Sequence, residues 1–191
     1  CCLVGKAWDF HVNVALEVPL DDNLDAIAES MAAVAKKARE PMFDAEHFFD
    51  GYRANPAYAI QTLLAAEGAG ADCLVLCDTN GGTLPFDIET IVGQVRQSLN
   101  ANGISVRIGI HTHNDSECAV VNSLVAVREG AGQVQGTING VGERCGNANL
   151  TSLVPTLLLK PSYADRFSIG VTAERLRNLT IASRVLDDIL N

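Results

Sequence analysis

Apolar positions follow two different spacings along the chain, and these spacings predict strands and helices in turn. Short, nearly continuous apolar runs predict strands, whereas apolar residues three and four positions apart predict amphipathic helices. The predicted strands are residues 3–14, 41–49, 72–78, 106–113 and 133–139. The predicted helices are residues 21–39, 55–69, 86–99, 116–129, 149–159 and 172–190. Alternation of this kind is typical of a parallel sheet that is covered by helices.

Two α/β architectures share this alternation, the closed (β/α)8 TIM barrel and the open doubly wound sheet. The glycine pattern of a dinucleotide-binding turn does not occur in the sequence. Polar side chains instead cluster at the C-terminal ends of four predicted strands, at Asp44, Glu46, Asp78, Thr79, His111, His113 and Asn139. A barrel places its active site at that face, whereas an open sheet binds mainly at one switch point. The pattern therefore favours the barrel.

Composition narrows the class of protein further. The 191 residues are 48% hydrophobic, which is enough to bury a core, and their net charge is −9. An acidic chain is a poor general nucleic-acid binder, and no apolar run is long enough for a membrane-spanning helix. Cys73 and Cys77 lie within an apolar run, which predicts buried free thiols in a reducing, cytoplasmic compartment. A complete barrel needs about 250 residues, so the chain is expected to be part of one.

Two histidines form the strongest local signal. His111 and His113 lie two apart on a predicted strand, so their side chains point to the same face, while Thr112 points toward the helices. Two imidazoles side by side at a strand end can chelate one divalent cation. The alternative is a pair of hydrogen-bonded histidines in a polar core. Geometry favours metal binding.

Three further segments carry candidate residues. The glycine-rich stretch 136–149 follows the last strand, and its Asn147 could offer a carbonyl oxygen to a metal held by the histidines. Such a stretch can also be an ordinary loop. Thr79 ends a buried strand and could hydrogen-bond a carboxylate, although helix capping explains the Asp78–Thr79 pair equally well. Asp44 and Glu46 share one strand face, where a carboxylate can act as a base.

Five separated motifs, taken together, resemble the DRE-TIM metallolyase superfamily, in the acyl-transferring branch of isopropylmalate, homocitrate and citramalate synthases. The motifs are KAWDFHV (6–12), DAEHFFDGY (44–52), LCDTNGG (76–82), GIHTHND (109–115) and GTINGVGERCGNANL (136–150). The first two are most similar to the long-chain citramalate synthases. The resemblance covers roughly residues 3–160.

The resemblance implies a Claisen-type condensation of acetyl-CoA with a 2-oxo acid, in first place pyruvate, to give citramalate. His111 and His113 are then metal ligands, with Asn147 at or near the metal, which could be Mg²⁺, Mn²⁺, Zn²⁺ or Co²⁺. Isopropylmalate or homocitrate synthase activity, with another 2-oxo acid, is the alternative. The family also implies a homodimer.

The matched motifs suggest roles for the remaining candidates. Thr79 would contact the carboxylate of the 2-oxo acid, and Glu46 would help to organise the reacting acyl group. Arg144 lies in the loop that closes over this end, and is taken as catalytic. Asn139, at the end of the last predicted strand, is taken as a substrate-binding residue.

One departure from the family is large, because the Asp-Arg-Glu motif of its first strand does not occur here. Residues 1–160 are therefore expected to form strands four to eight of the barrel, and residues 161–191 the start of a helical linker. A catalytically inactive fragment is accordingly the other reading of this chain. A smaller departure is Thr112, where the family more often has alanine between the two histidines.

Overall fold

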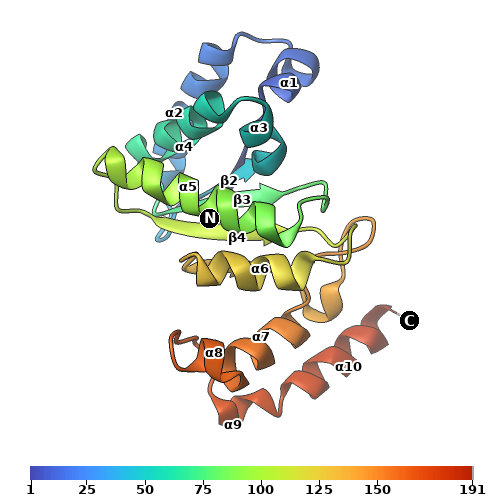
Figure 1. Ribbon diagram of the computed structural model, residues 1–191. Coiled ribbons are helices and arrows are strands. Elements are labelled where there is room, and N and C mark those ends of the chain that lie inside the picture. The colour runs from blue at the N-terminus through green and yellow to red at the C-terminus, as the bar shows by residue number, and fades with distance from the viewer. Residues whose placement is uncertain (191) are drawn as a thin grey trace.

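The computed structural model describes residues 1–190, which form one parallel sheet and its covering helices. Its strands are β1 (Cys2–Lys6), β2 (Met42–Glu46), β3 (Cys73–Asp78), β4 (Arg107–Thr112) and β5 (Gln133–Gln135). Each strand pairs with its neighbour in the sequence, in the order β1-β2-β3-β4-β5; Figure 1 labels the central strands β2, β3 and β4. Doubly wound sheets reverse this order at a switch point, whereas a barrel wall does not. The fold is a partial (β/α)8 barrel, and the predicted architecture is confirmed.

Helices connect and flank the strands. They are α1 (Asp9–His11), α2 (Leu20–Ala35), α3 (Phe48–Ala54), α4 (Pro56–Gly68), α5 (Pro85–Ala101), α6 (Ala119–Arg128), α7 (Leu150–Leu159), α8 (Pro161–Ala164), α9 (Ala173–Leu176) and α10 (Leu179–Leu190). A π-helical turn covers Val12–Leu16 and a 3-10 turn covers Ile138–Gly140. Helices α5 and α6 run alongside the sheet, and α7 to α10 gather at the end far from α1 and α2 (Figure 1). None of the helices within residues 1–190 is long and apolar enough to cross a membrane.

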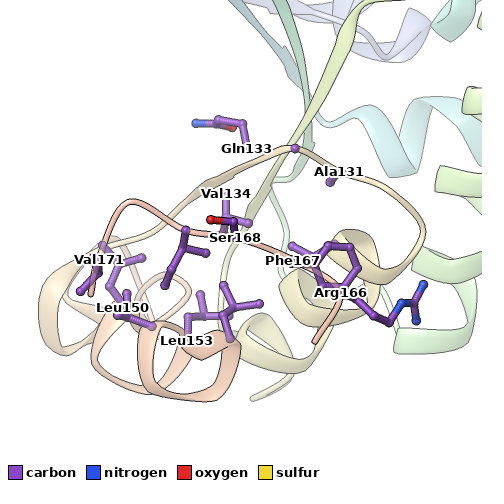
Figure 2. Close-up of a pocket in the computed structure, with 14 residues that line it drawn as sticks. Ala131, Gln133, Val134, Leu150, Leu153, Arg166, Phe167, Ser168 and Val171 are labelled. Atoms are coloured by element: carbon purple, nitrogen blue, oxygen red, sulfur yellow. The ribbon is translucent and has the colours of Figure 1, made fainter. Parts of the chain in front are cut away.

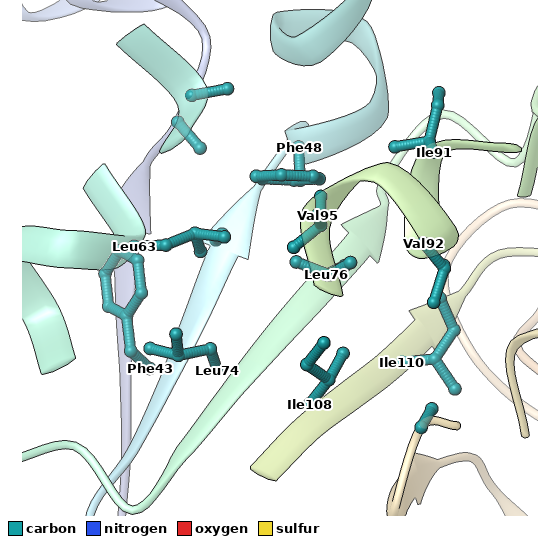
Figure 3. Packing of buried hydrophobic residues seen from close by; sticks show 14 of the residues in the cluster. Phe43, Phe48, Leu63, Leu74, Leu76, Ile91, Val92, Val95, Ile108 and Ile110 are labelled. Atoms are coloured by element: carbon teal, nitrogen blue, oxygen red, sulfur yellow. The ribbon is translucent and has the colours of Figure 1, made fainter. Parts of the chain in front are cut away.

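The core lies between the sheet and the helices. Alternate strand residues point to the helix-facing side, where the buried side chains include Phe43, Leu63, Leu74, Leu76, Val92, Val95, Ile108 and Ile110 (Figure 3). Burial of this apolar surface is the main force that holds the helices on the sheet. The opposite face carries a smaller apolar cluster of Cys73, Val75 and Cys77, with Met42 packed against it. Both cysteines are free thiols, as predicted.

Both edge strands pair on one side only among the residues described, so the sheet has two open edges. Five strands cannot satisfy the tilt and stagger of an eight-stranded barrel. Part of the inner face, at Asp44, Glu46 and His111, is accordingly half-exposed here, whereas Cys73 and Val75 on the same face are fully buried.

Three predicted strands, 3–14, 41–49 and 133–139, are clearly longer than the observed ones, and the second of them ends at Glu46. The expected strand 3–14 ends at Lys6, because Lys6 pairs with Glu46, the last residue of β2, and no ladder partner continues beyond it. Helical turns follow, in which the N–H groups of His11 and Val12 donate to the Trp8 carbonyl. The expected strand 133–139 likewise stops at Gln135, and residues 138–140 form a 3-10 turn.

Two features of the helices also differ from the prediction. The short helix α3 was not predicted, and it begins at Phe48, within the segment that was expected to be a strand. The predicted helix 172–190 is broken into α9 and α10 at residues 177–178, where the Asn178 carbonyl accepts from the Ala182 N–H and starts a new helix. Residues that favour helix caps commonly mark such breaks. No residue within 161–190 is buried, and the boundary at 160 stays a prediction.

Candidate active site

The two histidines converge at the C-terminal end of β4. His111 and His113 point to the inner face, and their Nε2 atoms are 3.3 Å apart. Thr112, between them, points the other way, where its hydroxyl donates to the Ala119 carbonyl (2.9 Å) and contacts the Ser123 hydroxyl (2.9 Å). The strand alternation that predicted this arrangement therefore holds at all three positions.

The glycine-rich loop brings Asn147 to the same place. Its backbone folds back along the strand end, so that Asn147 forms an isolated bridge with His113. The tight return needs glycine at position 146, which has a φ of 95° and lies against the Gly140 carbonyl, leaving no room for a Cβ. Asn147 donates from Nδ2 to the Val141 carbonyl (3.3 Å). Its Oδ1 is buried and accepts no hydrogen bond from the described residues.

The chemistry of these three side chains fits a divalent cation. Imidazole nitrogens and an amide oxygen are suitable ligands, and the buried Oδ1 of Asn147 is an acceptor without a donor, which costs free energy unless something binds it. Burial, and then the neighbouring His111, lower the pKa of His113, which favours the neutral form that binds metals. No group of three His, Cys, Asp or Glu side chains that could hold a metal occurs within residues 1–190.

Thr79 lies at the end of β3 with its hydroxyl already oriented. The backbone N–H of His47 donates to Thr79 Oγ1 (2.8 Å), so the Thr79 hydroxyl keeps its own proton to donate elsewhere. His47 has a φ of 55°, an uncommon conformation for a residue other than glycine, and its ring is held by Asp50 (3.1 Å). Asp78, next to Thr79, instead closes the following turn by accepting from the Thr83 hydroxyl (2.7 Å).

Glu46 forms an ion pair with Lys6 across the end of β1 and β2. The two residues are directly opposite in the strand register, which places both on the inner face. Lys6 was not singled out from the sequence, because only the pairing of these strands reveals that it faces Glu46. The pair lies at the same end of the sheet as the histidines, since all five strands are parallel.

Arg144 ties two of the site loops together. Its guanidinium donates to both oxygens of Asp115 (2.8 and 3.0 Å) and to the Thr79 carbonyl (2.6 Å). The hydrogen bonds from Arg144 lower the pKa of Asp115. Arg144 thus connects the turns after β3 and β4.

Asn139 is placed differently from the other candidates. Its Nδ2 donates to the Ser183 carbonyl (3.1 Å) and to Asp187 Oδ1 (2.9 Å), both in α10. Both of its donors are therefore used to hold the C-terminal helix against the 3-10 turn. A role in substrate binding stays a prediction, and it would require these bonds to break or its Oδ1 to act alone.

A second polar connection, besides the Lys6–Glu46 pair, was missed from the sequence. Gln135, on β5, lies 2.8 Å from His111 Nδ1 through its Oε1, and its Nε2 donates to Asp44 Oδ1 (2.8 Å). A polar residue in a short strand was the only available signal. The sequence could not show that Gln135 and Asp44, which are 91 positions apart, face each other across the inner face.

A separate hollow of about 420 Å³ lies beside β5, away from these polar groups. Its lining is mostly apolar and comes from α7, from residues near β5 and from residues 166–171; Figure 2 shows Leu150, Leu153, Val171 and Phe167 around it. None of the predicted site residues lines this hollow. It is therefore distinct from the candidate active site.

Sequence similarity assigns the chain to a known family. A family model described as HMGL-like matches residues 3–180. The chain belongs to the HMGL-like family. Among curated relatives, this HMGL-like chain is 54% identical over 191 residues to an (R)-citramalate synthase of Geobacter sulfurreducens, covering 100% of the chain and 34% of the relative. A 2-isopropylmalate synthase of Microcystis aeruginosa is 34% identical over 172 residues, covering 90% of the chain and 31% of the relative.

Solved structures show the same fold at low identity. Hydroxymethylglutaryl-CoA lyase from Pseudomonas aeruginosa matches with a TM-score of 0.77 at 16% identity, over 100% of this chain and 62% of that chain. An HMG-CoA lyase from Acenitobacter baumannii, in complex with coenzyme A and 3-methylmalate, matches with a TM-score of 0.70 at 20% identity. The match covers 99% of this chain and 61% of that chain. The HMGL-like chain spans about a third of the length of the curated relatives it matches.

Proposed function

We propose that the chain is the histidine-bearing part of an acyltransferase that condenses acetyl-CoA with pyruvate to give citramalate. The observation that carries the reaction type is the His111–His113 pair, to which Asn147, whose buried side-chain oxygen has no hydrogen-bond partner among the described residues, is bridged through its backbone. Sequence identity supports the choice of pyruvate, because it is 54% to an (R)-citramalate synthase and 34% to a 2-isopropylmalate synthase.

His111, His113 and Asn147 would hold the divalent cation, one of Mg²⁺, Mn²⁺, Zn²⁺ or Co²⁺. When bound, the cation would polarise the carbonyl of the 2-oxo acid as a Lewis acid. The three side chains occupy one side of such a site only. The remaining ligands, including any carboxylate, would come from the strands that close the barrel.

Thr79 would bind the other end of the 2-oxo acid. Its hydroxyl proton is free, because the oxygen already accepts from His47, so it can donate to the substrate carboxylate. Arg144 fixes the backbone at Thr79 through its carbonyl and adds positive charge near two anionic substrates. Both residues thereby orient the substrate at the mouth of the site.

Glu46 would act on the acetyl group of acetyl-CoA. A carboxylate at this position can take a proton from the methyl group of acetyl-CoA. The resulting carbanion adds to the carbonyl carbon of the 2-oxo acid, and the alkoxide so formed takes up a proton to become the hydroxyl of the product. Water then hydrolyses the thioester and releases CoA. Lys6 holds the Glu46 carboxylate on the inner face, facing the reactants.

A thiol-release assay on the full-length protein tests this proposal. We expect CoA thiol to appear from acetyl-CoA with pyruvate and a divalent metal, and to stop when the metal is chelated. Residues 1–191 alone serve as the negative control, because two open sheet edges leave the site incomplete. Equal or faster release with 2-oxoisovalerate would overturn the pyruvate assignment and favour isopropylmalate synthesis.

We also propose that the full-length protein is a homodimer and that it is located in the reducing environment of the cytoplasm. The location is supported by the unpaired, buried thiols of Cys73 and Cys77. Burial raises the pKa of Cys73 to about 11, so this thiol stays protonated and unreactive at neutral pH.

A further inference from the structure

Gln135 is the residue that connects His111 to a carboxylate. Its side chain lies on the inner face of β5, directly opposite His111 in the strand register. One end of its amide contacts His111 Nδ1 (2.8 Å) and the other donates to Asp44 Oδ1 (2.8 Å). The three side chains come from β4, β5 and β2, so the connection spans the inner face of the sheet.

The Asp44 carboxylate determines which way this amide points. A carboxylate only accepts hydrogen bonds, so the Gln135 NH2 group must face Asp44 and its Oε1 must face His111. An amide oxygen is also only an acceptor. His111 must therefore carry its proton on Nδ1, which leaves the lone pair on Nε2, the atom that faces His113.

The second histidine has no such partner. The Nδ1 of His113 is buried and makes no hydrogen bond with any residue in the described part of the chain. The orientation of the pair is therefore set from the His111 side. A ligand imidazole whose other nitrogen donates to a fixed acceptor has a fixed tautomer and ring orientation.

We infer that Gln135 is a positioning residue for the metal site, and that Asp44 holds its amide in the orientation that leaves His111 Nε2 unprotonated and aimed at the cation. This inference rests on the proposed function, because it assumes that the histidine pair binds a divalent cation. It assigns to Gln135 and Asp44 a part in metal binding without contact with metal or substrate.

A matched control lies on the same strand. Gln133 is two residues from Gln135 and also faces inward, but its Oε1 is buried without a hydrogen-bond partner within residues 1–190. Gln133→Leu removes the same kind of side chain from the same strand without touching His111. Loss of an amide that has no partner there is not expected to destabilise the fold.

The test measures Co²⁺ binding to the metal-free, full-length protein. Titration calorimetry gives the affinity, and the visible absorption of the bound ion reports its coordination. We expect Gln135→Leu to weaken Co²⁺ binding by about 10- to 100-fold and to change the absorption spectrum, as is usual for residues that orient a ligand. Gln133→Leu is expected to stay within about twofold of the unmodified protein.

Asp44→Asn is the second variant, in case Gln135→Leu does not fold. An asparagine can donate as well as accept, so Gln135 could turn its NH2 group toward His111. Neutral His111 would then be free to place its proton on Nε2, where metal binding is blocked. Weaker Co²⁺ binding with an unchanged melting temperature supports the inference.

Two results would overturn it, and they are distinguishable. If Gln135→Leu and Asp44→Asn both bind Co²⁺ within about twofold of the unmodified protein, the positioning role is wrong and the proposed function stands. If the unmodified protein binds no divalent cation, the metal site itself is wrong, and the proposed function falls with it.

Discussion

The two faces of the sheet are built from the same strands but from different kinds of side chain. On β2, Phe43 and Ala45 point outward and are completely buried against the helices. Asp44 and Glu46 alternate with them and point inward, where both keep part of their surface exposed. A strand has a period of two, so one short segment supplies both faces.

The same division occurs on β4. Ile108 and Ile110 are buried under the helices, and the Thr112 hydroxyl bonds to α6, whereas His111 and His113 lie on the inner face. The outer face buries apolar surface and provides most of the stability. The polar groups lie on the inner face, apart from that core, and there they remain able to bind ligands.

The largest expected effect comes from the inner face. His111→Ala removes a predicted ligand, so we expect metal binding by the full-length protein to fall by more than about 100-fold, beyond the effect usual for residues that only orient a ligand. Metal content after dialysis measures this. Thr112→Ala is the matched change one residue away, and it should lower stability by about 1–3 kcal/mol without loss of metal. Unchanged metal content in the His111 variant would disprove the ligand assignment.

A smaller effect is expected from a substitution on the outer face, where the affected quantity is the free energy of unfolding. Leu76→Ala leaves a cavity in the core between β3 and the helices, and should cost about 2–5 kcal/mol of unfolding free energy. The adjacent Cys77→Ala changes an inner-face residue and loses less buried volume, so it should cost clearly less. Urea denaturation of both variants measures the difference. Equal losses would show that the two faces do not differ in their contribution to stability.

The smallest effect concerns pH. Burial lowers the pKa of His113 and of His11, so between the lowered values and the ordinary 6.5 the unfolded chain binds more protons than the folded one. The free energy of unfolding of the metal-free protein should therefore keep its full value above pH 6.5 and decrease as the pH falls below 6.5. We expect a decline smaller than the effect of Leu76→Ala, measured by urea unfolding at pH 7.5 and 5.5. His113→Asn should reduce this decline, and a variant with the same pH profile would contradict the assignment.

The sequence predicted the histidine pair correctly in one respect, its orientation, because that depends on local strand geometry alone. His111 and His113 are two apart, and any strand places such residues on one face. The ends of β1 and β5 were not predictable in the same way. A strand stops where its neighbour stops, as Lys6 does opposite Glu46, and apolar content along the chain carries no information about that partner.

Local spacing by itself thus determined the α/β class, the alternation of strands and helices and the face on which the strand candidates Asp44, Glu46, His111 and His113 lie, since periods of two and 3.6 residues are properties of the backbone. Only the tertiary structure decided which polar groups meet. Lys6 with Glu46, and Asp44 with Gln135 and His111, come from different strands, and their contacts depend on strand register and on the inner curvature of the sheet. These long-range contacts arise when packing of the outer core holds the strands in place.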